Sequence, residues 1–535
     1  MKHNIKRILI FVLLISVITS GCNKDALKEN DRVNFNSSNF PTTLNTATYY
    51  SIAYESIAAL RGFGGWNSFF DLIETCTDEL VIPTRGGDWG DGGMWYTLHM
   101  HTWTADLPTV SNGWNWGFGA IGKCNNILKT LNDAPEFTGK VTLIAQVRAM
   151  RALYYYYMMD TFGNIPIYLK TDLSGGLPAT SPRADVFKFI ESELLAIQSE
   201  LPTNVDATTY GVPTLGFDQA LLAKLYLNAE VYTGTARWAD CLTQCNALIN
   251  SGKYGFSEVI SSFSPRIPTP LAAKTLNKFM SIFAPDNGQQ IKESIFAMVD
   301  DGQKGSGCIF TQPYMPKVGD QSFLELPYGG WSGGCALPSF FAKFNDPNDL
   351  RNAMWLNGPL YAPDGVTVIK NFDGSPYVII PELKFGVANP SVPFDVGGTA
   401  DGQRQGVRCM KYYPDGLHDY QDNDVQIFRY ADIIMMRGEA LARQGNNPML
   451  ALPDVNTIRV ERNAAPFTSL TWDDLLDERG REFAYEGWRR NDLIRFGQWG
   501  KPWGLKTNND SYRTIFPIPT NQLQLNKNLV QNTGY

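Results

Sequence analysis

A glycine-rich stretch near residue 90 carries an unusual density of tryptophan and charged side chains. Its aromatic and charged members between residues 78 and 103 include Arg85, Asp88, Trp89, Asp91, Trp95, Tyr96 and Trp103. An indole ring can stack on the flat apolar face of a sugar, while carboxylate and guanidinium groups can hydrogen-bond its hydroxyls. The stretch therefore indicates carbohydrate recognition, with Arg85, Asp88, Trp89 and Trp95 as predicted ligand contacts.

Trp89 is the residue of this stretch that we most expect at the surface. A single tryptophan more often belongs to a core, and this is the alternative for its neighbours. Glycines at positions 86, 87, 90, 92 and 93 surround Trp89, and such a sequence favours a loop over a helix or a packed strand. We therefore predict an exposed loop that presents Trp89.

The same combination of residues occurs a second time, at residues 328–334. Tyr328 and Trp331 stand here among glycines at positions 329, 330, 333 and 334. The chemical argument is the same, because aromatic rings on a loosened backbone can stack on sugar rings. Tyr328 and Trp331 are therefore predicted as further ligand contacts.

Three glutamates near the C-terminus have a spacing that could support catalysis. Glu478, Glu482 and Glu486 recur every four residues, which places them on one helix face at a separation that overlaps that of a retaining glycosidase pair. A glycosidase must, however, place its carboxylates around one sugar bond, whereas neighbours on one helix approach from the same side. Five arginines lie within reach: Arg479, Arg481, Arg489, Arg490 and Arg495. We therefore predict a neutralised ion-pair network that joins helices, and no catalytic residues.

Two motifs could bind metals. His99 and His101 would share one face of a strand, but outside the first residues of the chain the only other histidine is His418. Asp346 and Asp349 indicate an Asx turn that caps a short element, with calcium as the alternative because carboxylate oxygens suit it. The prediction is no cofactor and no metal.

The N-terminus has the pattern of a secretion signal. A basic start is followed by an apolar run at residues 8–18, which is shorter than the ~20 residues that a membrane-spanning helix needs. Ser20 and Gly21 precede Cys22, and this resembles the cleavage box of a lipoprotein, although Thr19 stands where such boxes usually have leucine. The resemblance implies that Cys22 carries acyl chains and anchors the protein to a membrane. An ordinary secreted protein is the alternative.

The composition predicts a large globular body with an acidic surface. Hydrophobic residues make up 44% of the chain and charged residues 19%. Removal of residues 1–21 leaves 43 of the 46 basic residues against 53 acidic ones, which changes the net charge from −7 to −10. This acidity argues against nucleic-acid binding, which requires basic patches. Seven cysteines besides Cys22 are scattered over the chain, so a disulfide framework is not required.

The elements that must position these residues are mostly helical. Helical patterns cover residues 46–60, 114–131, 146–162, 217–232 and 236–251. The third is the clearest, because Val147, Met150, Tyr154, Tyr157 and Thr161 recur at steps of three and four. Residues 22–45 are predicted to be a tether. Between residues 255 and 427 glycine, proline and aspartate become frequent, which is typical of long irregular segments that carry binding residues.

Several blocks near the C-terminus have the order and spacing of one protein family. They include Arg429-Tyr-Ala-Asp432, Asn456-Thr-Ile-Arg459, Glu478-Arg-Gly-Arg-Glu482, Asp492-Leu-Ile-Arg495 and Phe516-Pro-Ile-Pro519. Together with Arg148-Ala-Met-Arg151 and Gly163-Asn-Ile-Pro166, they resemble the SusD/RagB family. Members of this family are surface glycan-binding lipoproteins that partner TonB-dependent transporters in Bacteroidetes. A match in several blocks is more specific than one short motif.

The resemblance implies a fold and a function. The expected fold is mainly α and SusD-like, a tetratricopeptide-like scaffold of helical hairpins with an irregular, loop-rich ligand-binding region. The expected organisation is a signal peptide at 1–21, a tether at 22–45, an N-terminal helical region at 46–254 and a C-terminal region at 255–535, the last two packed as one body.

The implied role is non-catalytic capture of an oligosaccharide or polysaccharide at the cell surface. The resemblance further implies a lipid anchor in the outer membrane, facing outward, and a SusC-like TonB-dependent transporter as partner. Two alternatives stay open. A RagB-like protein would bind peptides, and a surface glycan hydrolase would need a carboxylate pair across the aromatic cleft, such as Asp88 or Asp91 opposite Asp300 or Asp301.

Overall fold

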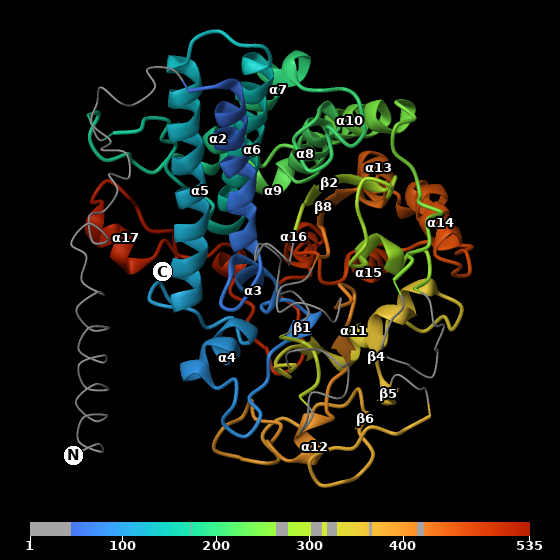
Figure 1. The fold of residues 1–535 in the computed structure, drawn as a ribbon. Helices are drawn as coiled ribbons and strands as arrows, with labels where there is room; N and C mark the ends of the chain where they lie inside the picture. Colours follow the sequence, from blue (N-terminus) through green and yellow to red (C-terminus); the bar gives the residue numbers. More distant parts are fainter. Residues whose placement is uncertain are drawn as a thin grey trace, which may run out of the picture.

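The structure is a computed structural model, and it describes residues 44–172, 174–263, 276–300, 313–317, 329–362, 366–414 and 422–535. The fold is mainly helical, as predicted. Figure 1 shows a helical layer around α2, α5 and α6, and at the opposite end a loop-rich part with short strands. The C-terminal helices α13 to α16 lie between these two parts.

The first half of the chain supplies most of the helical layer. Its helices are α2 (Thr46–Ala58), α3 (Phe69–Glu74), α4 (Met94–His99), α5 (Pro108–Asp133), α6 (Lys140–Phe162), α7 (Arg183–Ile197), α8 (Leu215–Leu227), α9 (Ala229–Thr233) and α10 (Trp238–Asn250). Pairs such as α5 with α6, α6 with α7, and α8 with α10 make extensive contacts, which is the packing of helical hairpins.

The second half contributes short helices, and its strands pair only two at a time. The helices are α11 (Pro338–Phe341), α12 (Ala400–Gln403), α13 (Tyr430–Gln444), α14 (Leu452–Glu461), α15 (Trp472–Phe483), α16 (Arg489–Arg495) and α17 (Thr520–Leu525). The strands are β1 (Leu80–Val81), β2 (Ser294–Met298), β3 (Cys335–Ala336), β4 (Trp355–Leu356), β5 (Gly358–Pro359), β6 (Val378–Ile379), β7 (Arg408–Cys409) and β8 (Val425–Arg429). They form antiparallel pairs β1 with β3, β2 with β8, β4 with β7, and β5 with β6.

Helix α6 is the centre of the helical layer. The five positions that the sequence pattern assigned to one face are all buried, but so are Leu153, Tyr155, Tyr156 and Met158 on the other sides. The helix is enclosed because α2, α5, α7 and α8 all contact it. It ends at Gly163, whose backbone has φ of 71°, a conformation that glycine adopts at low cost.

The other predicted helices are present with shifted ends. Helix α5 begins six residues before the predicted start, at Pro108, because proline suits the first turn of a helix. The predicted helix over residues 217–232 is divided at Asn228 into α8 and α9, since the Asn228 side chain donates a hydrogen bond to the carbonyl oxygen of Lys224. Helix α7 was not predicted.

The pairing of β1 with β3 brings together the two glycine-rich segments. Leu80 lies opposite Ala336, and Val81 lies opposite Cys335. The loop that follows β1 and the loop that precedes β3 therefore leave the pairing on the same side. This places the segment around Trp89 beside the segment around Trp331, although they are 242 residues apart in the chain.

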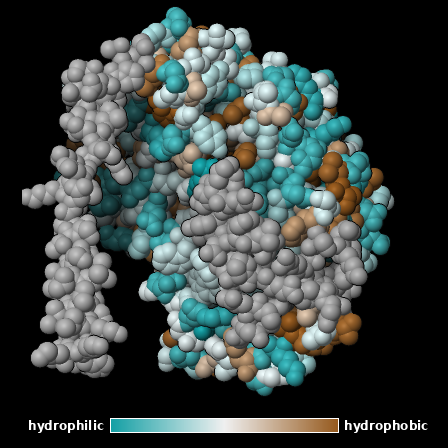
Figure 2. Space-filling view, viewed as in Figure 1, coloured by the Kyte–Doolittle hydropathy of each residue, from teal (hydrophilic) through white to brown (hydrophobic). Residues whose placement is uncertain are grey.

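Among the described residues, no helix is long and apolar enough to cross a membrane. Apolar side chains on the face shown in Figure 2 gather in separate patches, one of them over α14, where Val460 is exposed. The six cysteines of the described part are unpaired and buried, and the sulfur atoms of Cys241 and Cys245 lie 4.0 Å apart on one face of α10.

Candidate functional site

Three tryptophans from distant segments form one aromatic cluster. Trp89 lies in the loop after β1, Trp95 in α4, and Trp331 in the loop before β3. The ring centroids of Trp89 and Trp95 are 6.2 Å apart, and those of Trp89 and Trp331 are 6.4 Å apart. The indole N–H of Trp89 donates a hydrogen bond of 2.8 Å to the carbonyl oxygen of Trp331, which fixes the central ring.

The central ring is more enclosed than the sequence predicts. Only 8% of Trp89 is accessible, so the prediction that a glycine loop exposes it is wrong. The physical reason lies across the β1–β3 pairing, where Gly333 leaves room for the ring. A Cβ atom at Gly333 would lie 2.5 Å from Trp89, which no side chain could occupy without displacing the indole.

Trp95 is also buried, with 1% of its surface accessible, and its ring packs against that of Trp89. Its indole N–H donates a 2.6 Å hydrogen bond to the Asp91 carboxylate. Trp331 is the most accessible member of the three, because its side chain is only partly buried. The cluster therefore consists of one partly open ring on a support of two fixed rings, and Trp331 is its candidate stacking surface.

Arg85 has a structural position that the sequence argument did not foresee. It is 2% accessible, and it donates hydrogen bonds to the backbone carbonyls of Ser332, at 2.7 Å, and of Gln405, at 3.0 Å. Burial, and then the nearby charge of Arg408, lower the pKa of Arg85 to about 10. Since its donors already serve the protein backbone, the structure argues against the predicted ligand contact: Arg85 ties the two loops together.

The acidic residues at the edge of the cluster remain accessible. Asp88 is exposed and lies 3.3 Å from the amine of Lys317, in a pair with both side chains about half exposed. Asp91 is exposed as well. An exposed carboxylate beside a partly open indole can accept hydrogen bonds from hydroxyl groups. Two predicted residues, Tyr328 and the lipidation candidate Cys22, lie outside the described residues.

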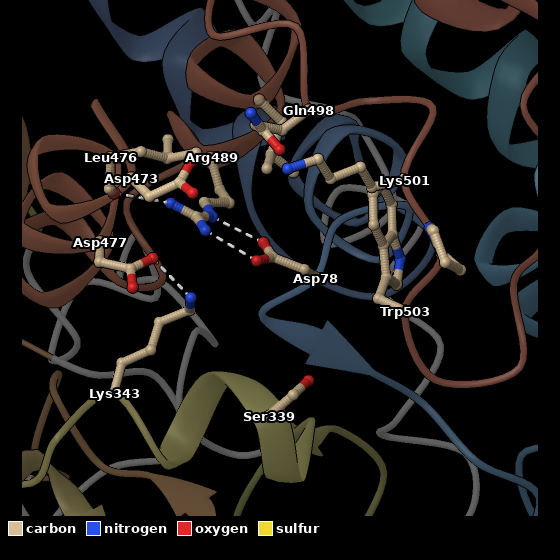
Figure 3. A pocket seen from close by; sticks show the side chains of 12 residues that line it. Asp78, Ser339, Lys343, Asp473, Leu476, Asp477, Arg489, Gln498, Lys501 and Trp503 are labelled. Carbon is tan, nitrogen blue, oxygen red and sulfur yellow. Dashed lines mark hydrogen bonds and ion pairs between the residues drawn. The ribbon is translucent and has the colours of Figure 1, made fainter. Parts of the chain in front are cut away.

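A second hollow, of about 300 Å³, lies between the C-terminal helices and β1 (Figure 3). Arg489 donates two hydrogen bonds, of 2.6 and 2.7 Å, to the Asp78 carboxylate, and the Lys343 amine lies 2.5 Å from the Asp477 carboxylate. Burial alone would raise the pKa of Asp78, but the charge of Arg489 holds it below its usual value. Asp78 and Asp477 are thus each neutralised by a cation of the protein, as expected of a scaffold.

The prediction that the C-terminal glutamates lie in an ion-pair network is confirmed, but its arginines are mostly others than those predicted. Of the five predicted arginines, Arg481 pairs with Glu478, whereas Arg479, Arg489, Arg490 and Arg495 pair with carboxylates outside the three glutamates. Arg462 contacts Glu482 at 2.8 Å, and Arg351 contacts Glu478 at 2.8 Å. Burial alone would raise the pKa of Glu478, but the charges of Arg351, Arg481 and Arg459 lower it to about 2. A carboxylate held ionised in this way cannot act as a general acid near neutral pH.

Arg429 is the central cation of this network, and it lies at the junction of β8 and α13. It contacts Glu293 at 2.5 Å, Glu482 at 3.1 Å and Glu486 at 2.7 Å, and all four side chains are at most 2% accessible. The network therefore joins β2, β8 and α15 in the interior.

The carboxylates of the hydrolase alternative have separate cationic partners. Asp88 pairs with Lys317, whereas Asp300 lies 3.6 Å from Arg61. Asp301 lies outside the described residues. The geometry does not favour this alternative.

The two metal-like motifs have structural partners. His99 lies in α4 and not in the predicted strand, and it accepts a hydrogen bond from the Leu505 amide at 3.1 Å. His101 hydrogen-bonds the carbonyl oxygen of Cys76 at 2.7 Å and stacks on Trp499. Burial lowers the pKa of His99 to about 4. Nowhere in the described part of the chain do three His, Cys, Asp or Glu side chains gather in a metal-binding group.

Asp346 and Asp349 form the predicted turn. Asp349 binds Arg351 through its carboxylate at 2.7 Å, and its side chain caps the 3₁₀ helix at Leu350–Met354. Asp346 accepts hydrogen bonds from the amides of Asn348 and Ala465. Both carboxylates therefore already serve protein donors.

Comparison with known protein families gives matches at both ends of the chain. The family model described as "SusD family" matches residues 400–535, and the one described as "Starch-binding associating with outer membrane" matches residues 87–227. The second match includes Trp89 and Trp95.

Comparison with individual proteins gives the same result. The starch-binding protein SusD of Bacteroides thetaiotaomicron is 28% identical over 434 residues, which cover 73% of this chain and 72% of the relative. SusD-like protein P25 of Formosa agariphila is 24% identical over 510 residues, 87% of this chain and 86% of the relative.

Solved structures share the fold. A SusD superfamily protein from Parabacteroides distasonis has a TM-score of 0.70 at 18% identity, with 92% of this chain and 100% of that chain covered. Surface glycan-binding protein A from Bacteroides thetaiotaomicron, solved in complex with laminarihexaose, has a TM-score of 0.68 at 18% identity, with 91% and 99% covered.

Proposed function

Because the chain belongs to the SusD/RagB family, we propose that it captures a glycan at the cell surface through the aromatic cluster and passes it to a SusC-like TonB-dependent transporter. The observation that carries the proposal is the convergence of Trp89, Trp95 and Trp331 from three separate segments, with one ring left partly open. A starch-binding relative and a structural neighbour solved with laminarihexaose support the glycan as ligand class.

Trp331 is the proposed stacking surface, and Asp88 and Asp91 are the proposed acceptors for sugar hydroxyls. The hydrogen bond from the Trp89 indole fixes the backbone at Trp331, and the Trp89 ring packs against the Trp331 ring, so the platform is formed before a ligand arrives. Such preorganisation lowers the entropy cost of binding. Trp89, Trp95 and Arg85 then act by positioning Trp331, and they do not touch the ligand.

Replacement of Trp331 by alanine tests the proposal. Loss of a central aromatic contact typically costs at least ~1–2 kcal/mol of binding free energy, so we expect affinity for the preferred glycan to fall at least about tenfold. Affinity gel electrophoresis with soluble starch and laminarin, followed by calorimetry on a glycan panel, measures this. Phe372→Ala is the matched control, because Phe372 is an aromatic residue that is 51% exposed in another part of the loop region.

Unchanged glycan affinity in Trp331→Ala would refute the site. Binding of peptides but of no glycan by the wild type would favour the RagB-like alternative, and release of reducing sugar from a polysaccharide would favour the hydrolase. The three readouts separate the three classes of function.

The proposed location is the outer surface of the outer membrane, with lipid on Cys22 as the anchor. Support comes from the lipoprotein-like sequence before Cys22 and from the match to the family described as "Starch-binding associating with outer membrane". Cys22→Ala should move the protein from the membrane fraction to the soluble fraction without changing its glycan affinity. Retention in the membrane fraction would contradict the anchor. Co-purification of a transporter barrel with the wild-type protein tests the partner.

A further inference from the structure

A large groove lies in the helical layer, remote from the tryptophan cluster. Its volume is about 750 Å³, within the usual range of ligand sites. Three elements enclose it: α2, the first turns of α6 and the segment at residues 202–212. In Figure 1, α2 is beside α5 and α6 at the top of the molecule, whereas α4, which carries Trp95, is at the bottom.

Two exposed tyrosines lie along one side of this groove. Tyr50 is 47% accessible and Tyr54 is 39% accessible, although both have large aromatic rings. They are four residues apart on α2, so they occupy successive turns of one helix face. Two large aromatic side chains that stay exposed on one helix face need an explanation, because burial of apolar surface stabilises a protein by about 25 cal/mol per Å².

Each tyrosine is held by its own neighbour. The Tyr50 hydroxyl is packed so closely over Gly139 that a Cβ atom there would clash with it. The Tyr54 hydroxyl lies 3.4 Å from the Arg61 guanidinium, which can donate a hydrogen bond to it. The two rings are thus positioned through their hydroxyl ends, while their surfaces face the groove.

The opposite end of the groove is a braced loop. The Asp206 carboxylate accepts hydrogen bonds from the Thr208 amide at 2.8 Å and from the Asn204 side chain at 2.7 Å. Thr209 closes the loop by donating to the carbonyl oxygen of Asn204 at 3.1 Å. The side chains of Asn204 and Thr208 are therefore fixed where they line the groove.

The lining has the chemistry of a neutral sugar site. Beside the two rings it presents amide and hydroxyl groups, on Ser51, Thr142, Gln146, Asn204 and Thr208, over an apolar floor of Ala53, Ile57, Leu143 and Val212. Ser51 and Gln146 already donate to the carbonyl oxygens of Ala47 and Pro213, so their side-chain oxygens serve as acceptors for sugar hydroxyls. Glu55 is the one lining residue with a formal charge, and it pairs with Lys123 at 3.1 Å. Aromatic faces beside neutral hydrogen-bonding groups suit pyranose rings, whereas a sulfated or uronic-acid glycan would require cations.

We propose that this groove, between α2, α6 and residues 202–212, is a second binding site for neutral oligosaccharides, with Tyr50 and Tyr54 as its stacking platform. The site stands on its own residues and does not require the tryptophan cluster. Where both sites bind, a polysaccharide long enough to span them gains avidity, because the second contact becomes intramolecular. Only this avidity depends on the proposed function.

The test compares four full-length proteins: the wild type, Tyr50→Ala/Tyr54→Ala, Tyr50→Phe/Tyr54→Phe and Trp331→Ala. Calorimetry with maltohexaose and laminarihexaose measures stoichiometry and affinity, and hydroxyl-radical footprinting measures protection of Tyr50 and Tyr54. We expect at least one hexasaccharide to protect both tyrosines. The affinity for that hexasaccharide at the groove should fall at least tenfold in the double alanine variant. The phenylalanine variant keeps the rings and should stay within about threefold of the wild type.

The outcomes for the two sites are distinguishable. If the double alanine variant binds like the wild type and neither hexasaccharide protects the tyrosines, the groove is not a sugar site, and the Trp331 site is unaffected by that result. If Trp331→Ala binds the hexasaccharides like the wild type while the double alanine variant loses affinity, the groove is a sugar site and the Trp331 site is refuted. Circular dichroism and thermal unfolding check the fold of each variant, and because both tyrosines are exposed we expect little change.

Discussion

The C-terminal ion-pair network and the tryptophan cluster both contain residues that could do chemistry, and they differ in what remains available. In the network every carboxylate meets an arginine, and the side chains of Arg429, Glu293 and Glu482 are at most 1% accessible. In the cluster Trp331 stays partly open and Asp88 is exposed. In both regions the residue types and their spacing are compatible with chemistry, so they do not tell a scaffold from a binding site. Accessibility after internal partners are satisfied is what separates a scaffold from a binding site.

The largest predicted effect comes from breaking the network. Arg429→Ala would leave Glu293, Glu482 and Glu486 without their central cation in the interior. Removal of one partner from a buried ion pair typically costs roughly 3–5 kcal/mol. We expect the free energy of unfolding, measured with urea, to fall by that order. Arg404→Ala is the control, because Arg404 pairs with Asp401 at the surface, where such pairs contribute about 0–1 kcal/mol. Similar losses in the two variants would contradict the comparison.

A second prediction contrasts the network with carboxyl groups that lack a cation. Burial raises the pKa of Asp71 from 3.8 to about 7, and that of Asp218 to about 7. A folded-state pKa above the unfolded value means that the contribution to stability is fully present below about pH 4 and is lost as the pH rises through about 7. For Glu478, whose pKa is lowered to about 2, the contribution is present above about pH 4.5 and is lost as the pH falls towards 2.

Asp71→Asn tests this sign. Between about pH 4 and 7 one extra bound proton in the folded state corresponds to a slope of about 1.4 kcal/mol per pH unit. The variant should lose that part of the slope, because asparagine resembles the protonated carboxyl and can still accept the hydrogen bond from the Ser68 amide. Urea unfolding at several pH values measures it. A slope equal to that of the wild type would show that Asp71 is ionised in the folded protein.

Gly333→Ala tests whether the position of Trp89 in the tryptophan cluster matters for binding. The added methyl group would lie 2.5 Å from Trp89, so the central ring must move and with it the support of Trp331. Overpacking of this kind typically costs ~1–3 kcal/mol of stability, and we expect a clear fall in glycan affinity as well. Gly119→Ala in α5 is the control, because a methyl group there meets open space and alanine favours a helix. Normal glycan affinity in Gly333→Ala would show that the position of Trp89 does not matter for binding.

The smallest predicted effect is that of Asp88→Ala. The pair between Asp88 and Lys317 is exposed, so its loss should change stability by no more than ~1 kcal/mol. If Asp88 accepts a sugar hydroxyl, calorimetry should show a severalfold loss of glycan affinity at unchanged thermal stability. A stability change without an affinity change would assign Asp88 to the scaffold.

Local patterns predicted the helices well, because their causes are local. The 3.6-residue period predicted α6, and the four-residue spacing of the glutamates predicted that they would lie in an ion-pair network. The burial of Trp89 could not be predicted, since its cause, the space left by Gly333, lies more than two hundred residues away. The role of Arg85 was missed for the same reason, because its partners Ser332 and Gln405 come from other loops. Tyr50 and Tyr54 did carry a signal, the spacing of one helix face, but nothing local distinguishes an exposed face from a buried one.

The short pairing between β1 and β3 has a consequence for how the protein reaches its native state. Only two residue pairs join Leu80–Val81 to Cys335–Ala336, yet they close a loop of about 250 residues. Closing so long a loop is slow compared with forming helical hairpins such as α5 and α6. The stacking platform should therefore mature late in folding, after the helical layer. A fragment that ends after α10 would lack Trp331 and Gly333, so it could form helices without gaining the tryptophan site.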